Sequence, residues 1–319
     1  MFRRSLTIAK QSIYTRLNRL LFNIECRGIL KTKPIYSKDE RVVVISILSH
    51  KDVLMYLIAA KSFYHHLKSG AFVLINDGTL SDVDKRLIAK HIVGIKIVNA
   101  SDINKNNPNC PKGGTWERLL YASDVNNENY CIVLDADTIT IGDIPEVREC
   151  IAKNVPFIML GSSKDSIKGM KSYWEELAPK IKIEDFYSKW DFQQNFDHGL
   201  NRIPNFTSLK YVKGSSGFHG QSRQDFPRKR LEEFSIQMKA VFHERWNDWS
   251  SEQSTVCVLV SNVENSVALP FEKYAVHWNE SNMNYHNCSF LHFIGPCRFV
   301  GRRYQKLSKD FIKKMKRLE

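Results

Sequence analysis

Residues 130–140 read YCIVLDADTIT, a short apolar run that is followed at once by two acidic residues. The unbroken apolar segment 132–134 is typical of a strand covered on both faces, as in a parallel sheet. Side chains alternate along a strand, so we expect Asp135 and Asp137 to project together from its carboxyl end, with Ala136 on the opposite side. Two adjacent carboxylates repel each other unless a positive charge lies between them, and a divalent cation is the usual one. The alternative is a turn whose acids merely cap the next segment.

This apolar run is one of several that alternate with helical patterns. The expected strands cover 41–48, 72–77 and 95–98, and the expected helices cover 52–67, 81–91 and 115–125. Ser81 and Asp84 have the spacing of a capping box. Repeated β-α units of this size predict an α/β fold with a mainly parallel sheet, of the nucleotide-binding type. Neither a Gly-x-Gly-x-x-Gly nor a Walker loop is present, so a bound nucleotide would have its phosphates held by metal and side chains.

The composition fits one large globular domain or two smaller units, because 43% of the 319 residues are hydrophobic. No run approaches the roughly 18 apolar residues of a spanning helix. Basic residues interrupt the first apolar stretch, so we expect no secretory signal and a cytoplasmic protein. The seven cysteines never show Cys-x-x-Cys spacing, which argues against a disulfide framework and against a zinc site.

The formal net charge of +13 is concentrated at the two ends of the chain. Residues 1–33 carry eight Lys/Arg and one acid, residues 298–319 carry nine and two, and the rest is nearly neutral. Both ends have apolar residues at helical spacing, namely Ile13, Leu17, Leu20 and Ile24 in one and Tyr304, Leu307, Phe311, Met315 and Leu318 in the other. Basic amphipathic helices bind anionic membranes, so we expect a peripheral protein on the inner face of a membrane. The alternative is that both stripes pack on the protein. No nucleic-acid partner is expected, because the central region lacks a basic patch mixed with aromatic residues.

The second half of the chain adds three further features. The alternation lapses at about 163–205, an aromatic stretch that we interpret as an insertion, either stacking on sugars or forming its own small core. Residues 211–220, YVKGSSGFHG, predict a glycine-studded strand that a ligand can approach closely. Glu252 and Gln253 open an apolar helix, where they are either capping groups or site groups. His292 lies in a short apolar strand, and a lone histidine there is usually a satisfied core residue.

Taken in order, the acidic strand end, the Ser-Ser-Gly strand, the Glu-Gln helix start and the closing His-Phe-Ile-Gly resemble the GT-A glycosyltransferases. The branch that the motifs resemble most contains glycogenin and the bacterial lipopolysaccharide galactosyltransferases. The resemblance spans about residues 41–300 and lies in the order of the motifs, none of which suffices alone. It implies a GT-A α/β sandwich over 34–299, flanked by the basic amphipathic segments 1–33 and 300–319.

The resemblance also implies roles for individual residues. Asp135, Asp137 and His292 would hold Mn²⁺ or Mg²⁺ against the diphosphate of a nucleotide-sugar donor. Glu252 and Gln253 would lie near the donor sugar and its anomeric carbon. Further donor contacts would come from Arg118, Ala136, Ser216, Gly217, Gly295 and Arg298. The chemistry agrees, because an imidazole beside two carboxylates favours Mn²⁺ over Mg²⁺, and a cation stabilises a departing diphosphate.

The chain departs from this branch at one point. Where the branch continues its His-x-x-Gly with Lys-Pro-Trp, this chain has 296–299 as Pro-Cys-Arg-Phe, so Arg298 would replace the phosphate-binding lysine. The stereochemistry stays open at this stage. The branch implies retention, whereas Glu252 as a general base would give inversion.

Two other classes of protein fit some of the same residues. Residues 134–138 also match the Asp-x-Asp-x-Thr start of haloacid-dehalogenase-like phosphatases, with Asp135 as nucleophile and Asp137 as acid/base. Against this, three strands precede the motif, and no acid pair that ends a strand and could bind Mg²⁺ follows it apart from Glu184-Asp185. A non-catalytic membrane-surface module is the other alternative. We expect the transferase, acting on a glycan or lipid-linked acceptor in surface polysaccharide or lipopolysaccharide synthesis.

Overall fold

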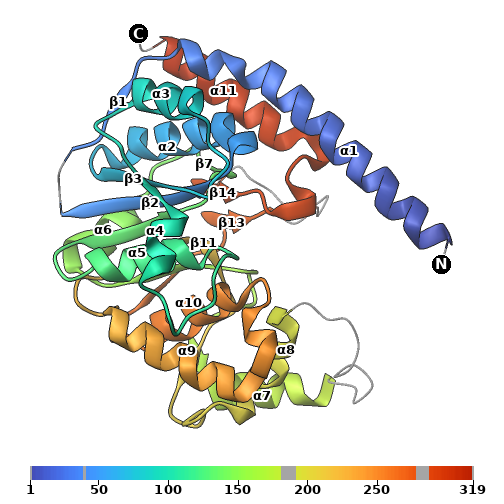
Figure 1. The fold of residues 1–319 in the computed structure, drawn as a ribbon, viewed down its shortest axis with the longest axis vertical. Coiled ribbons are helices and arrows are strands. Elements are labelled where there is room, and N and C mark those ends of the chain that lie inside the picture. The colour runs from blue at the N-terminus through green and yellow to red at the C-terminus, as the bar shows by residue number, and fades with distance from the viewer. Residues whose placement is uncertain (1, 39–40, 181–191, 278–286, 318–319) are drawn as a thin grey trace.

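The computed structural model describes residues 2–38, 41–180, 192–277 and 287–317 (Figure 1). Its helices are α1 (Phe2–Cys26), α2 (Val53–Leu67), α3 (Asp82–His91), α4 (Ala100–Lys105), α5 (Trp116–Val125), α6 (Pro145–Lys153), α7 (Met170–Leu177), α8 (Phe192–His198), α9 (Arg228–Phe242), α10 (Ser251–Ser261) and α11 (Arg303–Arg317). Its strands are β1 (Ile35–Tyr36), β2 (Val42–Leu48), β3 (Ala71–Asn76), β4 (Ile92–Val93), β5 (Lys96–Asn99), β6 (Tyr130–Leu134), β7 (Thr138–Thr140), β8 (Phe157–Leu160), β9 (Lys168–Gly169), β10 (Lys210–Tyr211), β11 (Gly214–Gln221), β12 (Val267–Leu269), β13 (Tyr274–Val276) and β14 (Phe290–His292).

A seven-stranded sheet forms the centre of the protein, in the order β12-β8-β11-β6-β2-β3-β5. Strands β6, β2, β3 and β5 run parallel to one another, and β12 is parallel to β8. The predicted α/β fold with a mainly parallel sheet is therefore confirmed. Strand β11 is the exception, because it lies between β6 and β8 and runs antiparallel to both. Phe218 pairs with Leu134, so the residues just before Phe218 lie at the edge where β6 ends.

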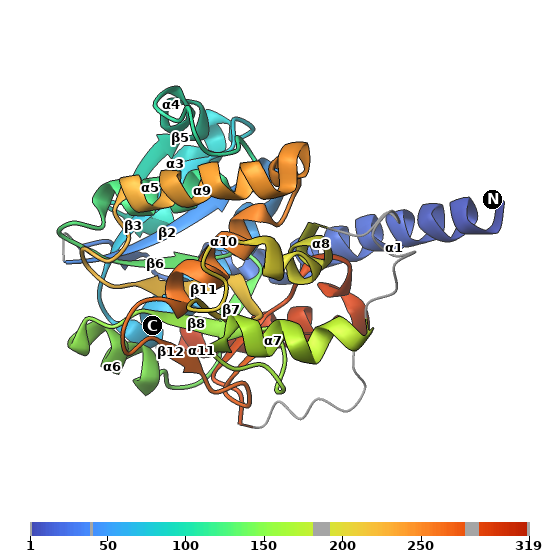
Figure 2. The same ribbon diagram turned by 90° about the horizontal axis from the view of Figure 1, so that it is seen from below.

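Helices cover both faces of this sheet, with α2 and α11 on one side and α5, α9 and α10 on the other (Figures 1 and 2). This arrangement explains why β2 is apolar throughout. Val42 and Val44 belong to the hydrophobic cluster on one face, whereas Val43 and Ile45 belong to the cluster on the other. A strand covered on both faces needs apolar side chains at every position, as the sequence pattern predicts.

A second, three-stranded sheet brings a late part of the chain beside the acidic residues. Its order is β13-β14-β7. Strand β7 begins directly after the turn at 135–137, and β14 pairs with it antiparallel. The register sets His292 opposite Thr138. The small sheet thus delivers the imidazole to the end of β6.

The terminal helices α1 and α11 lie side by side, and the first part of α1 extends beyond the rest of the protein (Figures 1 and 2). Phe22 is fully buried and stacks on Tyr304, with ring centroids 4.8 Å apart. Tyr304 and Phe311 are buried, so the apolar stripe of α11 faces the protein. This is the packing alternative considered for the C-terminal stripe, whose last member, Leu318, lies outside the described residues. Within the described residues, no helix is both long and apolar enough to cross a membrane.

Most predicted elements lie where the sequence places them. Helix α3 begins with the predicted capping box, in which the Ser81 hydroxyl and the Asp84 carboxylate bond each other's backbone N–H groups. The glycine-studded strand is shorter than predicted. Strand β11 begins at Gly214, and Tyr211 belongs instead to β10, which pairs with β9.

The described part of the expected insertion forms α7, α8 and β9, while residues 181–191 lie outside the described part of the chain. Its aromatic residues pack on each other and on the helices that follow. Phe192 and Phe196 are buried, and their ring centroids lie 5.5 Å and 5.3 Å from the ring centroid of Phe242. These buried aromatic residues belong to the large hydrophobic cluster that also contains Val43 and Trp116, so the alternative of a small separate core is wrong for them.

Phe22 joins α1 to the rest of the fold, so its truncation is a direct test of this packing. We expect Phe22→Ala to lower the free energy of unfolding by about 3–5 kcal/mol, because it removes a fully buried ring. Leu20→Ala is the matched control, since Leu20 is 56% exposed and its truncation should change stability by less than about 0.5 kcal/mol. Urea unfolding of both variants measures the difference. Equal stability of the two variants would contradict the packing of α1.

Candidate active site

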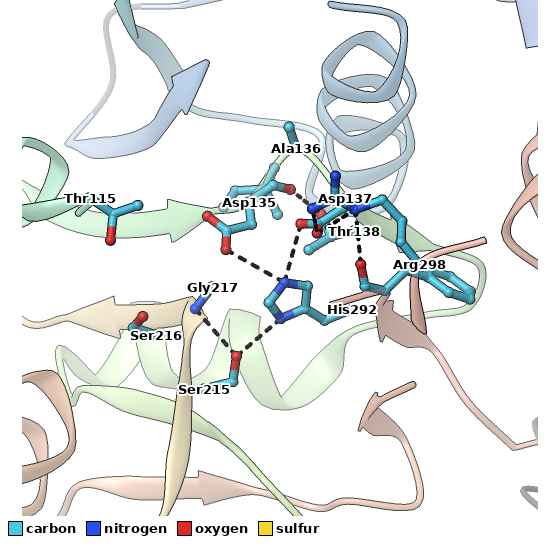
Figure 3. Close-up of polar contacts among 12 residues, drawn as sticks. Thr115, Asp135, Ala136, Asp137, Thr138, Ser215, Ser216, Gly217, His292 and Arg298 are labelled. Atoms are coloured by element: carbon cyan, nitrogen blue, oxygen red, sulfur yellow. Dashed lines mark hydrogen bonds and ion pairs between the residues drawn. The ribbon is translucent and has the colours of Figure 1, made fainter. Parts of the chain in front are cut away.

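The acidic turn between β6 and β7 is fixed by its backbone. Asp135 N–H donates to Gly217 O (2.8 Å), and Phe293 N–H donates to Asp137 O (2.9 Å). The two acids therefore lie on a turn, and not on a continuing strand as the alternation of side chains predicted. Their carboxylates nevertheless converge on one point, while Ala136 points away from it (Figure 3).

Three potential metal ligands meet at this turn. His292 Nε2 lies 3.2 Å from Asp137 Oδ1 and 3.5 Å from Asp135 Oδ2. One ligand atom from each residue lies within 4.8 Å of the other two, and this is the only such His/Cys/Asp/Glu cluster among the described residues. Two carboxylate oxygens and an imidazole nitrogen suit Mn²⁺ and related divalent cations.

The neighbours of His292 orient it for this role. Ser215 Oγ lies 3.0 Å from Nδ1, so the other ring nitrogen, Nε2, is left facing the carboxylates (Figure 3). Such a partner on the second nitrogen commonly fixes the orientation of a metal-binding histidine. Gly217 leaves the space between the ligands open. A Cβ atom at this position would overlap both His292 and Asp135 Oδ2.

Two arginines bind the outer oxygens of the same carboxylates. Arg298 donates from Nε to Asp137 Oδ2 (3.0 Å), and Arg118 pairs with Asp135 Oδ1. The oxygens that face His292 are the other member of each pair, Asp137 Oδ1 and Asp135 Oδ2. A cation can therefore bind between the ligands without displacing either arginine. The residues fit a divalent metal ion on this ground.

Glu252 belongs to the same network, although it lies at the start of α10. Its oxygens accept hydrogen bonds from Arg118 Nε (3.3 Å), Ser216 Oγ (2.9 Å) and Thr115 Oγ1 (3.1 Å). It is 1% exposed. Glu252 thus joins α5, β11 and α10 through its side-chain hydrogen bonds.

Burial and charge act in opposite directions on these acids. Burial opposes ionisation of Asp137, but the positive charge of Arg298 and the adjacent His292 outweigh it and hold the pKa of Asp137 well below its usual range. At Glu252 burial is the stronger effect, and the pKa is raised despite Arg118. Asp137 is therefore kept as an anion, which is the form that binds a metal ion.

A pocket of about 300 Å³ opens beside this cluster, at the carboxyl ends of the parallel strands. Its polar lining includes Ser49 after β2, Asp77 after β3, and Thr115 and Glu117 at the start of α5. Ligands of open α/β sheets bind at this edge. Thr115 lines the pocket and also donates a hydrogen bond to Glu252, so it links the pocket to the hydrogen-bond network around the acidic turn.

The structure brings most of the predicted site residues together. The connected set comprises Arg118, Asp135, Asp137, Ser216, Gly217, Glu252, His292 and Arg298. Three others lie at its margin. Ala136 O accepts a hydrogen bond from Tyr304 (3.3 Å), Gln253 is half-buried next to Glu252, and Gly295 begins the short turn that leads to Arg298.

Two site residues were not singled out by the sequence. Ser215 stands in the glycine-studded strand, and its role follows only from the pairing of β11 with its neighbours. Thr115 starts α5 with a left-handed backbone (φ 77°), directly after Gly113 and Gly114, which are also left-handed. A β-branched residue in this conformation is strained, and such strain often marks functional sites. The Gly-Gly-Thr sequence at 113–115 was the feature that could have indicated it.

Solved structures resemble this chain at low sequence identity. No family model and no curated protein matches this chain. Among solved structures, the bifunctional glycosyltransferase WbbM is 12% identical, with a TM-score of 0.49 over 87% of this chain and 52% of its own, so this chain spans about half of it. The galactosyltransferase LgtC, solved with donor and acceptor sugar analogues, is 12% identical, with a TM-score of 0.49 over 84% of this chain and 96% of its own. Core-mannan synthase A from Aspergillus fumigatus, in an Mn/GDP form, is 9% identical, with a TM-score of 0.38 over 70% of this chain and 71% of its own.

These solved proteins are glycosyltransferases, the class that the order of motifs in the sequence resembles. With so few identical residues, we derive the function from the chemistry of the site itself.

Gly217 provides a sharp test of the cation site. We expect Gly217→Ala to weaken Mn²⁺ binding by about tenfold or more, because its methyl group would displace His292 or Asp135. Gly169→Ala is the matched control, since a Cβ there meets only ordinary contact with Ser172. Isothermal titration with Mn²⁺ measures both. Wild-type affinity in Gly217→Ala would rule out this cradle as the cation site.

Proposed function

We propose that the protein is a metal-dependent glycosyltransferase that moves a sugar from a nucleotide-diphosphate donor to a glycan or lipid-linked acceptor. The observation that carries the proposal is the convergence of Asp135, Asp137 and His292 next to a pocket at the carboxyl edge of the sheet. A nucleoside diphosphate needs both parts, an organic pocket and a place for its negative charge.

The cluster would hold the cation through Asp135 Oδ2, Asp137 Oδ1 and His292 Nε2. When bound, Mn²⁺ or Mg²⁺ supplies Lewis-acid stabilisation to the diphosphate leaving group. Arg298, 20% exposed at its side chain, lies at the rim of the cluster and is placed to donate to the phosphates.

The pocket would take the nucleoside. Its volume of about 300 Å³ falls at the lower end of the range for small-molecule sites. Ser49 and Asp77 supply polar groups for a base edge or ribose hydroxyl. Thr115 marks the passage from the pocket towards Glu252 and the cation site.

Glu252 would stabilise positive charge that develops at the donor sugar. Both of its oxygens already accept hydrogen bonds, and it is buried. A general base needs an oxygen free to take the proton of the acceptor hydroxyl. The observed contacts therefore favour positioning and electrostatic roles for Glu252, which agrees with retention of configuration.

The phosphatase alternative fits the structure less well. The Asp-x-Asp-x-Thr motif of that class normally follows the first strand of its domain, whereas β2, β3 and β5 of the central sheet all precede Asp135 here. The Glu184-Asp185 pair lies outside the described residues. A non-catalytic membrane-surface module would have no need for the convergence of Asp135, Asp137 and His292.

Thermal unfolding with UDP, GDP, CDP and ADP, each with and without Mn²⁺, tests the proposal. We expect one diphosphate to raise the melting temperature only when Mn²⁺ is present. A ligand at 100 times its dissociation constant stabilises the fold by about 2.7 kcal/mol, which such a melt resolves. Asp137→Asn should abolish the shift.

Asp143→Asn is the control for this experiment, because it makes the same change at an acid whose side chain is 66% exposed and pairs with Arg148. This variant should respond to the nucleotide as the wild type does. If no diphosphate stabilises the protein while Mg²⁺ with a phosphate mimic does, the transferase proposal is overturned in favour of a phosphatase.

A further inference from the structure

Helix α1 presents a second apolar face that the described part of the protein leaves uncovered. Tyr14, Leu17, Leu20, Leu21 and Ile24 are 49%, 56%, 56%, 41% and 63% exposed. Their spacing places them on one side of the helix. Isolated exposed apolar side chains are ordinary, but five on one helix face form a patch of the kind that marks an interaction surface.

The opposite face of α1 is locked in place, so this patch cannot turn inwards. Phe22 and Cys26 are fully buried. Arg19 pairs with Asp52, and Arg302 pairs with Glu25. Rotation of α1 to hide the patch would break the aromatic contacts and both ion pairs. The outward patch is therefore a fixed feature of the folded protein.

The basic residues of α1 indicate that the partner of this patch is negatively charged. From residue 2 to residue 24 the sequence has five Lys/Arg and no acid. Arg16 and Arg27 are exposed, and the first acid, Glu25, is paired with Arg302 and Lys309. Two copies of so basic a helix would repel each other, whereas an anionic surface attracts it.

We propose that α1 docks on an anionic membrane, lying in the interface with this apolar face in the lipid. Amphipathic helices with apolar and basic residues arranged in this way bind the headgroup region. Helix α11 does not use its own stripe for this purpose, because that stripe is buried against the protein. Membrane docking is thus assigned to one terminal helix instead of two.

The same helix also connects to the candidate active site. Phe22 stacks on Tyr304, and the Tyr304 hydroxyl donates to Ala136 O in the acidic turn (3.3 Å). Docking through α1 would therefore tether the site to the bilayer that would carry a lipid-linked acceptor. This last step rests on the proposed function, whereas the docking itself does not.

Sedimentation with lipid vesicles tests the docking on the full chain. The vesicles are phosphatidylcholine containing about one third phosphatidylglycerol, and pure phosphatidylcholine serves for comparison. We expect binding to the anionic vesicles, and a loss of about tenfold or more in Leu17→Ser/Ile24→Ser. The control, Val83→Ser/Ile236→Ser, removes two similarly exposed side chains (65% and 51%) from α3 and α9 and should bind as the wild type does.

Circular dichroism and nucleotide-dependent melting of each variant separate docking from folding and from donor binding. Both should be unchanged in Leu17→Ser/Ile24→Ser, whether or not the protein is a transferase. Unchanged vesicle binding in this variant would overturn the proposal. So would a wild-type dimer that does not bind vesicles and that these substitutions convert to a monomer, because the patch would then be a self-interface.

Discussion

The repulsion between two carboxylates on one short turn is the constraint on which this structure depends. Asp135 and Asp137 approach the same imidazole, and Asp137 is nearly buried. Arg118 and Arg298 neutralise them from outside while the inner oxygens remain available. Arg118 comes from α5 and Arg298 from the turn before α11, so two distant parts of the chain supply the balancing charge.

The antiparallel strand β11 is the structural device that completes the site. Because it runs against β6, its first residues reach the edge where β6 ends. Ser215 then contacts His292, Ser216 contacts Glu252, and Gly217 leaves the cradle open. A parallel strand in this place would have brought its last residues to the edge instead. One reversed strand therefore brings Ser215, Ser216 and Gly217 to the edge of the sheet that carries the acidic turn.

The sequence predicted the sheet well because both faces of its strands are covered, which makes runs such as 42–48 apolar throughout. The pair of Asp135 and Asp137 followed from the spacing at the end of a strand, whereas His292 joined it only through a family resemblance, since it reaches the turn through a sheet pairing. Ser215 was missed for the same reason. The apolar stripes of α11 and α1 look alike in sequence, yet only the stripe of α11 is buried. Helix α1 instead packs through Phe22, which lies outside its stripe and stacks on Tyr304 of α11.

Anomalous diffraction from crystals soaked with MnCl₂ and the stabilising nucleoside diphosphate would test the central claim most directly. We predict one strong manganese peak bounded by Asp135 Oδ2, Asp137 Oδ1 and His292 Nε2, with the diphosphate on its open side and the nucleoside in the pocket beside Thr115. A nucleotide bound in that pocket with no manganese at the cluster, or manganese bound elsewhere, would contradict the account.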